Sequence, residues 1–193
     1  MIKMNTQPMT FRPTKISRTW AMPNSETFSI KPIKELVGRY VEKVPKFRVE
    51  GQRFSLIVDP FVRNSPFKDG CLSNDLDTDI EADYHMDALE FLESIDDGTV
   101  DLMLFDPPYS PRQVSECYKK MDKTVNMQTT QSSFWGNLKK EVERVIAPKG
   151  VVITCGWNSG GIGKTLGFSI EEILLVPHGG WHNDTIVTVE RKL

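Results

Sequence analysis

The chain has 193 residues, of which 39% are hydrophobic and 26% charged, and its formal net charge is -2 at pH 7. This length and composition predict one globular domain with a sizeable core, and the near-neutral charge argues against binding nucleic acid through bulk positive charge. Neither a disulfide framework, a cysteine-rich zinc site nor a membrane span is expected, because the three cysteines are far apart without a CxxC pair and no apolar stretch is long enough.

The N-terminal residues 1–24 contain Pro, Thr and Asn with weak periodicity, and they predict an irregular arm that Arg12, Lys15 and Arg18 make locally basic. Residues 25–193 are expected to form the single domain. The arm has no secretory signal, so we expect a cytoplasmic protein with reduced thiols.

Helices are predicted where apolar residues recur three and four positions apart: 31–44, 86–95 and 132–147. Strands are predicted where short apolar runs end in turn residues: 54–61, 70–77, 100–109, 151–157, 170–176 and 185–189. A polar loop rich in Gly and His joins the last two strands, which favours an antiparallel hairpin.

Strands that alternate with helices predict an α/β fold, with a mostly parallel sheet and helices on both faces. Ligands in such sheets bind at the carboxyl ends of the strands. Asp59, Asp75, Asp106 and Gly156 all lie at or just after predicted strand ends, so we expect a binding site there.

The segment "FDPPYS" (105–110) combines a carboxylate, two prolines and an aromatic ring directly after a buried strand. An exocyclic amine of adenine or cytosine is a poor nucleophile, and two acceptors for its N–H groups favour the geometry from which it attacks a methyl donor. The Asp106 carboxylate and the Pro107 carbonyl suit these two roles, the pair with Pro108 fixes the backbone, and Tyr109 suits stacking on the base. A turn capped by Asp106 is the structural alternative.

With this motif, the chain resembles the S-adenosylmethionine-dependent amino-methyltransferases of DNA, chiefly the N6-adenine enzymes. The resemblance covers the chain from about residue 20 and is greatest to small phage and prokaryotic forms without a separate target-recognition domain. It implies a Rossmann-like class I methyltransferase fold with a seven-stranded sheet, a double-stranded DNA substrate whose target base is flipped out, and a cytoplasmic location in a prokaryotic cell or phage-infected host.

The resemblance also implies residues that bind S-adenosylmethionine. The segment "TFSIKPI" is similar to the part that contacts the methionine end of the cofactor, and "VDPF" to the start of the first cofactor motif. Asp75 falls where the family binds the ribose hydroxyls, and Asp87 where an acidic residue faces the adenine. The residues so implied are Thr27, Phe28, Ile30, Asp59, Pro60, Phe61, Asn64, Asp75 and Asp87.

The first cofactor motif, which begins with "VDPF" (58–61), departs from the family pattern because no glycine follows it until Gly70. Val62, Arg63 and Asn64 stand where the family has small residues and glycines that let the backbone approach the cofactor. Either Arg63 or Asn64 contacts the cofactor's carboxylate, or the loop binds the cofactor more weakly.

Acidic residues at turns and helix starts have simpler explanations too. Asp59 also fits a cap of the Pro60 turn, and Asp75 lies in an acidic run typical of a solvated surface. Asp87 also fits the favourable charge at a helix start.

Besides the N-terminal arm, two surface segments are candidates for nucleic-acid contact. Trp181, His182 and Asn183 lie in the predicted hairpin loop, where no third ligand supports a metal site with His178. Residues 110–132, with Arg112, Lys119, Lys120 and Lys123, are interpreted as a mobile loop that follows backbone phosphates or as a solvated surface. The Gly-rich segment 156–164 lacks the phosphate-loop spacing and is interpreted as a flexible loop near the site.

Three hypotheses follow for the function. The first is methylation of adenine N6 in DNA without a metal. The second keeps the chemistry but places it on cytosine N4, an RNA base or a protein amide. The third is a non-catalytic nucleic-acid-binding subunit. So short a chain also predicts a short recognition site, or specificity that comes from a homodimer or a partner.

Overall fold

The computed structural model describes residues 13–45, 47–48, 53–120 and 132–193. The strands are β1 (Lys15–Arg18), β2 (Phe47–Arg48), β3 (Arg53–Phe54), β4 (Leu56–Asp59), β5 (Leu72–Ser73), β6 (Val100–Phe105), β7 (Ile146–Gly156), β8 (Phe168–Val176) and β9 (Thr185–Lys192). The helices are α1 (Lys31–Val41), α2 (Ala88–Glu93), α3 (Pro111–Lys120) and α5 (Ser132–Val145), with 3-10 turns η1 (Thr27–Ser29), η2 (Lys68–Gly70) and η3 (Lys164–Leu166).

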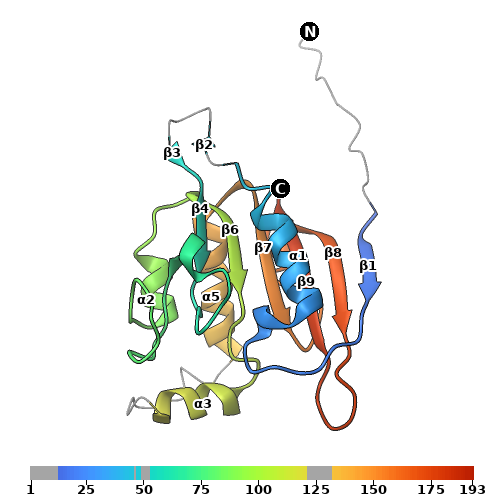
Figure 1. Cartoon of the computed structure of the whole chain (residues 1–193). Helices are drawn as coiled ribbons and strands as arrows, with labels where there is room; N and C mark the ends of the chain where they lie inside the picture. The colour runs from blue at the N-terminus through green and yellow to red at the C-terminus, as the bar shows by residue number, and fades with distance from the viewer. Residues whose placement is uncertain (1–12, 46, 49–52, 121–131) are drawn as a thin grey trace.

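The main sheet has seven strands in the order β1-β8-β9-β7-β6-β4-β5 (Figure 1). All neighbouring strands are parallel except that β9 runs antiparallel to both β7 and β8. This confirms the predicted α/β fold with its mostly parallel sheet and C-terminal antiparallel hairpin. The short strands β2 and β3 form a separate antiparallel pair.

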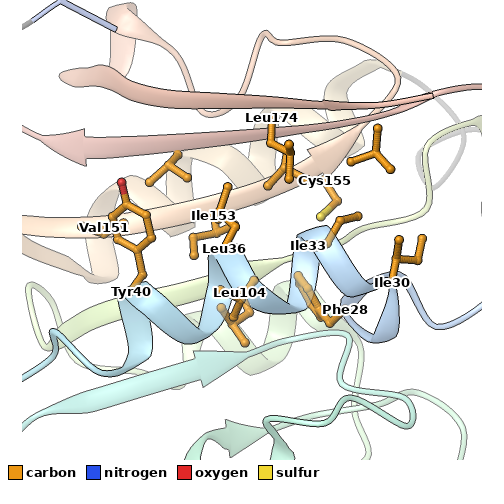
Figure 2. Packing of buried hydrophobic residues seen from close by; sticks show 14 of the residues in the cluster. Phe28, Ile30, Ile33, Leu36, Tyr40, Leu104, Val151, Ile153, Cys155 and Leu174 are labelled. Carbon is orange, nitrogen blue, oxygen red and sulfur yellow. The ribbon is translucent and has the colours of Figure 1, made fainter. Parts of the chain in front are cut away.

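The central strand β6 shows why both faces of the sheet carry helices. All six of its residues are buried, and alternate side chains point to opposite faces. Leu102 and Leu104 pack in the cluster that α1 covers, which Figure 2 shows around Ile33 and Leu36. Met103 and Phe105 pack on the other face, with the buried residues of α2 and α5. The continuous apolar sequence of this strand therefore fits burial on both sides.

The expectation of an irregular arm is wrong for residues 15–18. They form β1, which pairs in parallel with β8 at the edge of the sheet. The Lys15 ammonium lies 2.8 Å from the buried carboxylate of Glu172, which Arg39 of α1 also contacts at 2.9 Å. The four residues of β1 include only one large apolar side chain, Ile16, and that side chain is exposed. The strand therefore depends on its pairing with β8 and leaves no apolar pattern in the sequence. Arg12 lies outside the described residues.

The expectation of a loop over 110–132 is wrong for residues 111–120, which form α3. Val114 and Tyr118, one helical turn apart, are buried and hold this helix against the domain. Lys123 lies outside the described residues. None of the helices that the structure describes is both long and apolar enough to cross a membrane.

Candidate active site

A cleft of about 500 Å³ lies at the carboxyl ends of β4, β5 and β6. Asp59 ends β4, Gly156 ends β7, and Asp106 directly follows β6, so the predicted placement of these residues at strand ends is confirmed. Helix α3 lies beyond the same edge of the sheet (Figure 1) and contributes to the lining of the cleft. The predicted site residues that line it are Thr27, Pro60, Phe61, Asp75, Asp87, Asp106, Pro107, Pro108 and Tyr109.

Neighbouring side chains hold the Asp-Pro-Pro-Tyr turn at two backbone positions. The Trp135 indole on α5 donates to the Pro108 carbonyl oxygen at 3.0 Å. The Tyr109 amide donates to the Gln113 side-chain oxygen on α3 at 2.7 Å. Helices on both sides of the turn therefore fix its backbone, in addition to the restriction that the two prolines impose.

The Asp106 carboxylate accepts a hydrogen bond from the Tyr109 hydroxyl, and the Thr27 side chain also hydrogen-bonds to it. Burial raises the pKa of Asp106 above its ordinary value, and the bonds from Tyr109 and Thr27 oppose this rise. Burial raises the pKa of Tyr109 as well, so its hydroxyl stays protonated and acts as a donor. The Tyr109 ring also makes an edge contact with Trp157, with ring centroids 5.6 Å apart.

The loop after β4 is organised by Asn74, which sequence reasoning missed. Its amide group donates to the carbonyl oxygens of Pro60 and Met86, at 3.2 and 3.1 Å, and its side-chain oxygen accepts from the Met86 amide. The side chain is almost fully buried and joins the two loops that form one wall of the cleft. An Asn at a strand end gives no sequence signal that separates this bracing role from an ordinary turn.

Asp59 is buried behind this wall and does not contribute to the cleft lining. One carboxylate oxygen accepts from the Phe61 amide at 3.1 Å, while the other has no hydrogen-bond partner among the described residues. Burial raises the pKa of Asp59 well above its ordinary value, and the carboxylates of Asp106 and Asp75 add to the rise. These contacts agree with the turn-capping alternative.

The loop continues through Arg63, whose φ of 45° lies in the left-handed region. Its amide donates to Asp75 at 2.9 Å, and its guanidinium lies 3.4 Å from the Glu26 carboxylate. The other Asp75 oxygen accepts from the Asp77 amide at 2.9 Å. Each oxygen of Asp75 retains a lone pair for a further donor, and the side chain borders the cleft.

Asp87 caps α2, because one carboxylate oxygen accepts from the Leu89 amide at 2.9 Å. The second oxygen accepts from the Tyr118 hydroxyl on α3. Burial is the main cause that raises the pKa of Tyr118, and the hydrogen bond to Asp87 raises it further. Asp87 therefore anchors α3 to the wall of the cleft, and Tyr118 is a second residue that the sequence did not reveal.

Several other candidate residues lie outside the cleft lining. Phe28 and Ile30 are buried in the core beneath α1, so they are packing residues in this structure. Asn64 is exposed, and its backbone N–H donates to the Glu26 carboxylate at 3.3 Å. On α3, Lys119 is exposed, and exposed Arg112 forms an ion pair with Glu116 at 2.7 Å.

The loop between β8 and β9 lies at the same edge of the sheet as the cleft (Figure 1). Its base is fixed by His178, whose ring nitrogens lie 2.9 Å from the Ala21 carbonyl oxygen and 2.8 Å from the Thr185 hydroxyl. Beyond this base, Trp181, His182 and Asn183 are all exposed. Within the described residues, no group of three His, Cys, Asp or Glu side chains is arranged to hold a metal ion.

The Gly-rich segment 156–164, interpreted as a flexible loop, is held by a buried carboxylate. Glu190 accepts from the amides of Ile162 and Gly163, and a Cβ atom at Gly161 would lie 2.1 Å from a Glu190 oxygen. Gly161 also has a φ of 49°, so both space and backbone conformation favour glycine there. Within this segment, Trp157 is the residue that contacts Tyr109 of the Asp-Pro-Pro-Tyr turn.

No protein-family model and no curated protein sequence matches the chain. Solved structures do match. The putative methyltransferase yhhF from Escherichia coli has a TM-score of 0.54 and 8% identity, covering 90% of this chain and 91% of that one. SMU.1697c, a putative methyltransferase from Streptococcus mutans in complex with SAH, has a TM-score of 0.50 and 12% identity, covering 83% and 97%.

TrmN from Thermus thermophilus has a TM-score of 0.52 and 15% identity over 85% of this chain, which spans about half (49%) of the TrmN chain. The chain has a Rossmann-like methyltransferase fold. At these identities the methyltransferase fold is what the likeness establishes, and the chemistry must be argued from the cleft itself.

Proposed function

We propose that the chain transfers a methyl group from S-adenosylmethionine to the exocyclic N6 amine of adenine in double-stranded DNA. The observation that carries the proposal is the cleft, which brings the Asp-Pro-Pro-Tyr turn together with Asp75 and Asp87. The methyltransferase fold, shared with a protein in complex with SAH, supports the same reaction class.

The charge of the cleft fits this cofactor. S-adenosylmethionine carries a positive sulfonium and an amino-acid group, and five carboxylate side chains line the cleft: Asp75, Asp77, Asp87, Asp106 and Glu116. Asp75 would accept from the ribose hydroxyls, and Asp87 would face the adenine. Phe61 and Ala88 supply apolar surface next to them. When bound, the cofactor supplies an electrophilic methyl group on its sulfonium.

Asp106 and the Pro107 carbonyl would accept the two N–H groups of the target amine. This favours a pyramidal nitrogen whose lone pair is free to form the new C–N bond. The Tyr109 hydroxyl now donates to one oxygen of Asp106, and the carboxylate retains lone pairs that the incoming amine would use. Tyr109 would then stack on the base and hold it in line.

The proton balance needs no strong base. As the C–N bond forms, the bond between the methyl group and the sulfonium would break, and S-adenosylhomocysteine would leave as a neutral thioether. The methylated nitrogen then bears one proton too many, and that proton passes to water. Asp106 acts throughout as a hydrogen-bond acceptor, and its ionised form is the better one.

The same turn offers its two acceptors to other planar amines. Cytosine N4, an RNA base and a protein amide are therefore alternative substrates. A non-catalytic nucleic-acid-binding subunit is the alternative of another class, and the lack of glycine in the loop after β4 favours it. Trp181, His182 and Asn183, with Arg112 and Lys119 on α3, are proposed nucleic-acid contacts, and a homodimer or partner would supply further specificity.

The test is methyl transfer from labelled S-adenosylmethionine to unmethylated double-stranded DNA, followed by mass analysis of the nucleosides. We expect N6-methyladenine from the wild-type protein. Asp106→Ala should lower the rate by at least about a hundredfold, the range for loss of a transition-state hydrogen bond, while cofactor binding stays the same. Another methylated nucleoside would move the substrate, and normal turnover by Asp106→Ala would refute the mechanism.

A further inference from the structure

Arg63 is unusual in both its charge and its backbone. It is the only cationic side chain among the described residues that line the cleft, which five carboxylate side chains also line. Its φ of 45° is a conformation that costs a non-glycine residue free energy. Such strain persists where the surrounding structure enforces it and is concentrated at functional sites.

The interactions of Arg63 link it to both Asp75 and Asp106. Its amide is fixed by Asp75 at 2.9 Å. Its guanidinium is paired with Glu26, which immediately precedes Thr27, a hydrogen-bond partner of Asp106. The positive charge also acts on Asp106, where it opposes the rise in pKa that burial causes. Arg63 therefore lies near both the residue assigned to the ribose and the residue assigned to the target amine.

We propose that Arg63 exchanges its ion pair with Glu26 for the carboxylate of the methionine part of S-adenosylmethionine, and so makes the cleft selective for ligands that carry this carboxylate. This inference rests on the proposed function, because it takes that cofactor as the ligand. It selects Arg63 over Asn64, because only Arg63 lines the cleft.

The charges explain why this role is needed. An acidic cleft attracts the sulfonium and ammonium groups of the cofactor but repels its carboxylate. A guanidinium binds a carboxylate through two parallel hydrogen bonds. The present pair with Glu26 is replaceable, because its N–O distance is 3.4 Å and more than half of the Arg63 side chain is exposed. Exposed pairs of this kind contribute little stability, so a ligand carboxylate competes well.

The experiment is calorimetric binding of S-adenosylmethionine and of its decarboxylated analogue, which lacks only the carboxylate. The wild-type protein should bind S-adenosylmethionine about tenfold to a hundredfold more tightly than the analogue, the range for a charge-assisted hydrogen-bonded pair. Arg63→Gln should remove this preference by weakening only S-adenosylmethionine. Arg63→Lys, which keeps the charge, should retain part of it.

Lys68→Gln is the matched control. Lys68 lies in the same connection between β4 and β5 and forms an exposed ion pair with Glu81, but it does not line the cleft. Its variant should keep the wild-type preference, and thermal melting should show that all variants are folded. Equal losses for both ligands in Arg63→Gln, or no loss, would overturn the role of Arg63 alone. Failure of the wild-type protein to bind either ligand would overturn the proposed function and this inference with it.

Discussion

At the residue scale, the protonation state of Asp106 separates two possible roles for its carboxyl group. Burial raises its pKa above the ordinary value of 3.8, so the folded protein favours the neutral form more than the unfolded chain does. The stability that this shift contributes is full below pH 3.8 and is lost as the pH rises through the higher pKa of the folded state. Ionised Asp106 is the better acceptor, so activity should change with pH in the opposite direction.

We therefore expect methylation by the wild-type protein to fall as acid protonates Asp106. Asp106→Asn keeps a side-chain oxygen as an acceptor, but an uncharged one that does not titrate. It should retain activity at about a fifth of the wild-type rate, since a charged acceptor is worth about 1 kcal/mol more than a neutral one. Its rate should no longer fall with acid at the pH where the wild-type rate does.

The pH profile of kcat/KM for both proteins checks this, with Asp106→Ala as the variant that has no acceptor. If Asp106→Asn were as inactive as Asp106→Ala, the carboxylate would be acting as a proton acceptor and not only as a hydrogen-bond acceptor.

At the scale of elements, the Asp-Pro-Pro-Tyr turn depends on α3, which follows it directly, and on α5, which lies farther along the chain. Trp135 reaches it from α5 and Gln113 from α3. Trp135 lies in the helix predicted over 132–147, where its apolar ring fits the helical pattern and its N–H group adds no signal. Its hydrogen bond to Pro108 shows that one side chain both packs on a helix and supports the turn.

Trp135→Phe keeps most of the ring and removes the donor to the Pro108 carbonyl oxygen. We expect a loss of about 1 kcal/mol in stability and a fall in kcat of about tenfold, since the turn loses one of its two side-chain supports. The affinity for S-adenosylmethionine should not change. Trp20→Phe, at an exposed position, is the control, and an unchanged kcat in Trp135→Phe would show that the prolines alone fix the turn.

The elements that the sequence predicted are those with a strong local pattern. Strand β6 was predicted from its continuous apolar run, because it is buried on both faces. Helix α1 was predicted from apolar residues three and four positions apart, because it is buried on one face. Strand β1 and helix α3 were missed for one physical reason. Each is held by tertiary contacts, such as Lys15 with Glu172 and Tyr118 with Asp87, which no local pattern records.

At the scale of the whole molecule, the site joins segments from both halves of the chain. The Thr27 turn, the β4–β5 connection, the start of α2 and the turn after β6 all line one cleft. The sequence predicted that strand ends would meet there, because the topology of a parallel sheet requires it. It did not show that Phe28 and Ile30 turn into the core while Thr27 reaches Asp106. That division depends on how η1 packs under α1.

A ligand that contacts all these segments should stabilise the whole fold, because it binds only when they are assembled. At a concentration of about one hundred times its Kd, S-adenosylhomocysteine should contribute about 2.7 kcal/mol to the free energy of unfolding. For a chain of this size that corresponds to a rise in Tm of roughly 5–10 °C. Thermal melting over a series of ligand concentrations measures it, with adenosine as the control ligand that lacks the methionine part. Arg63→Gln should show a smaller rise at the same concentration. A Tm that stays constant up to the solubility limit would favour the non-catalytic binding subunit, because an assembled cofactor cleft cannot bind its ligand without shifting the unfolding equilibrium.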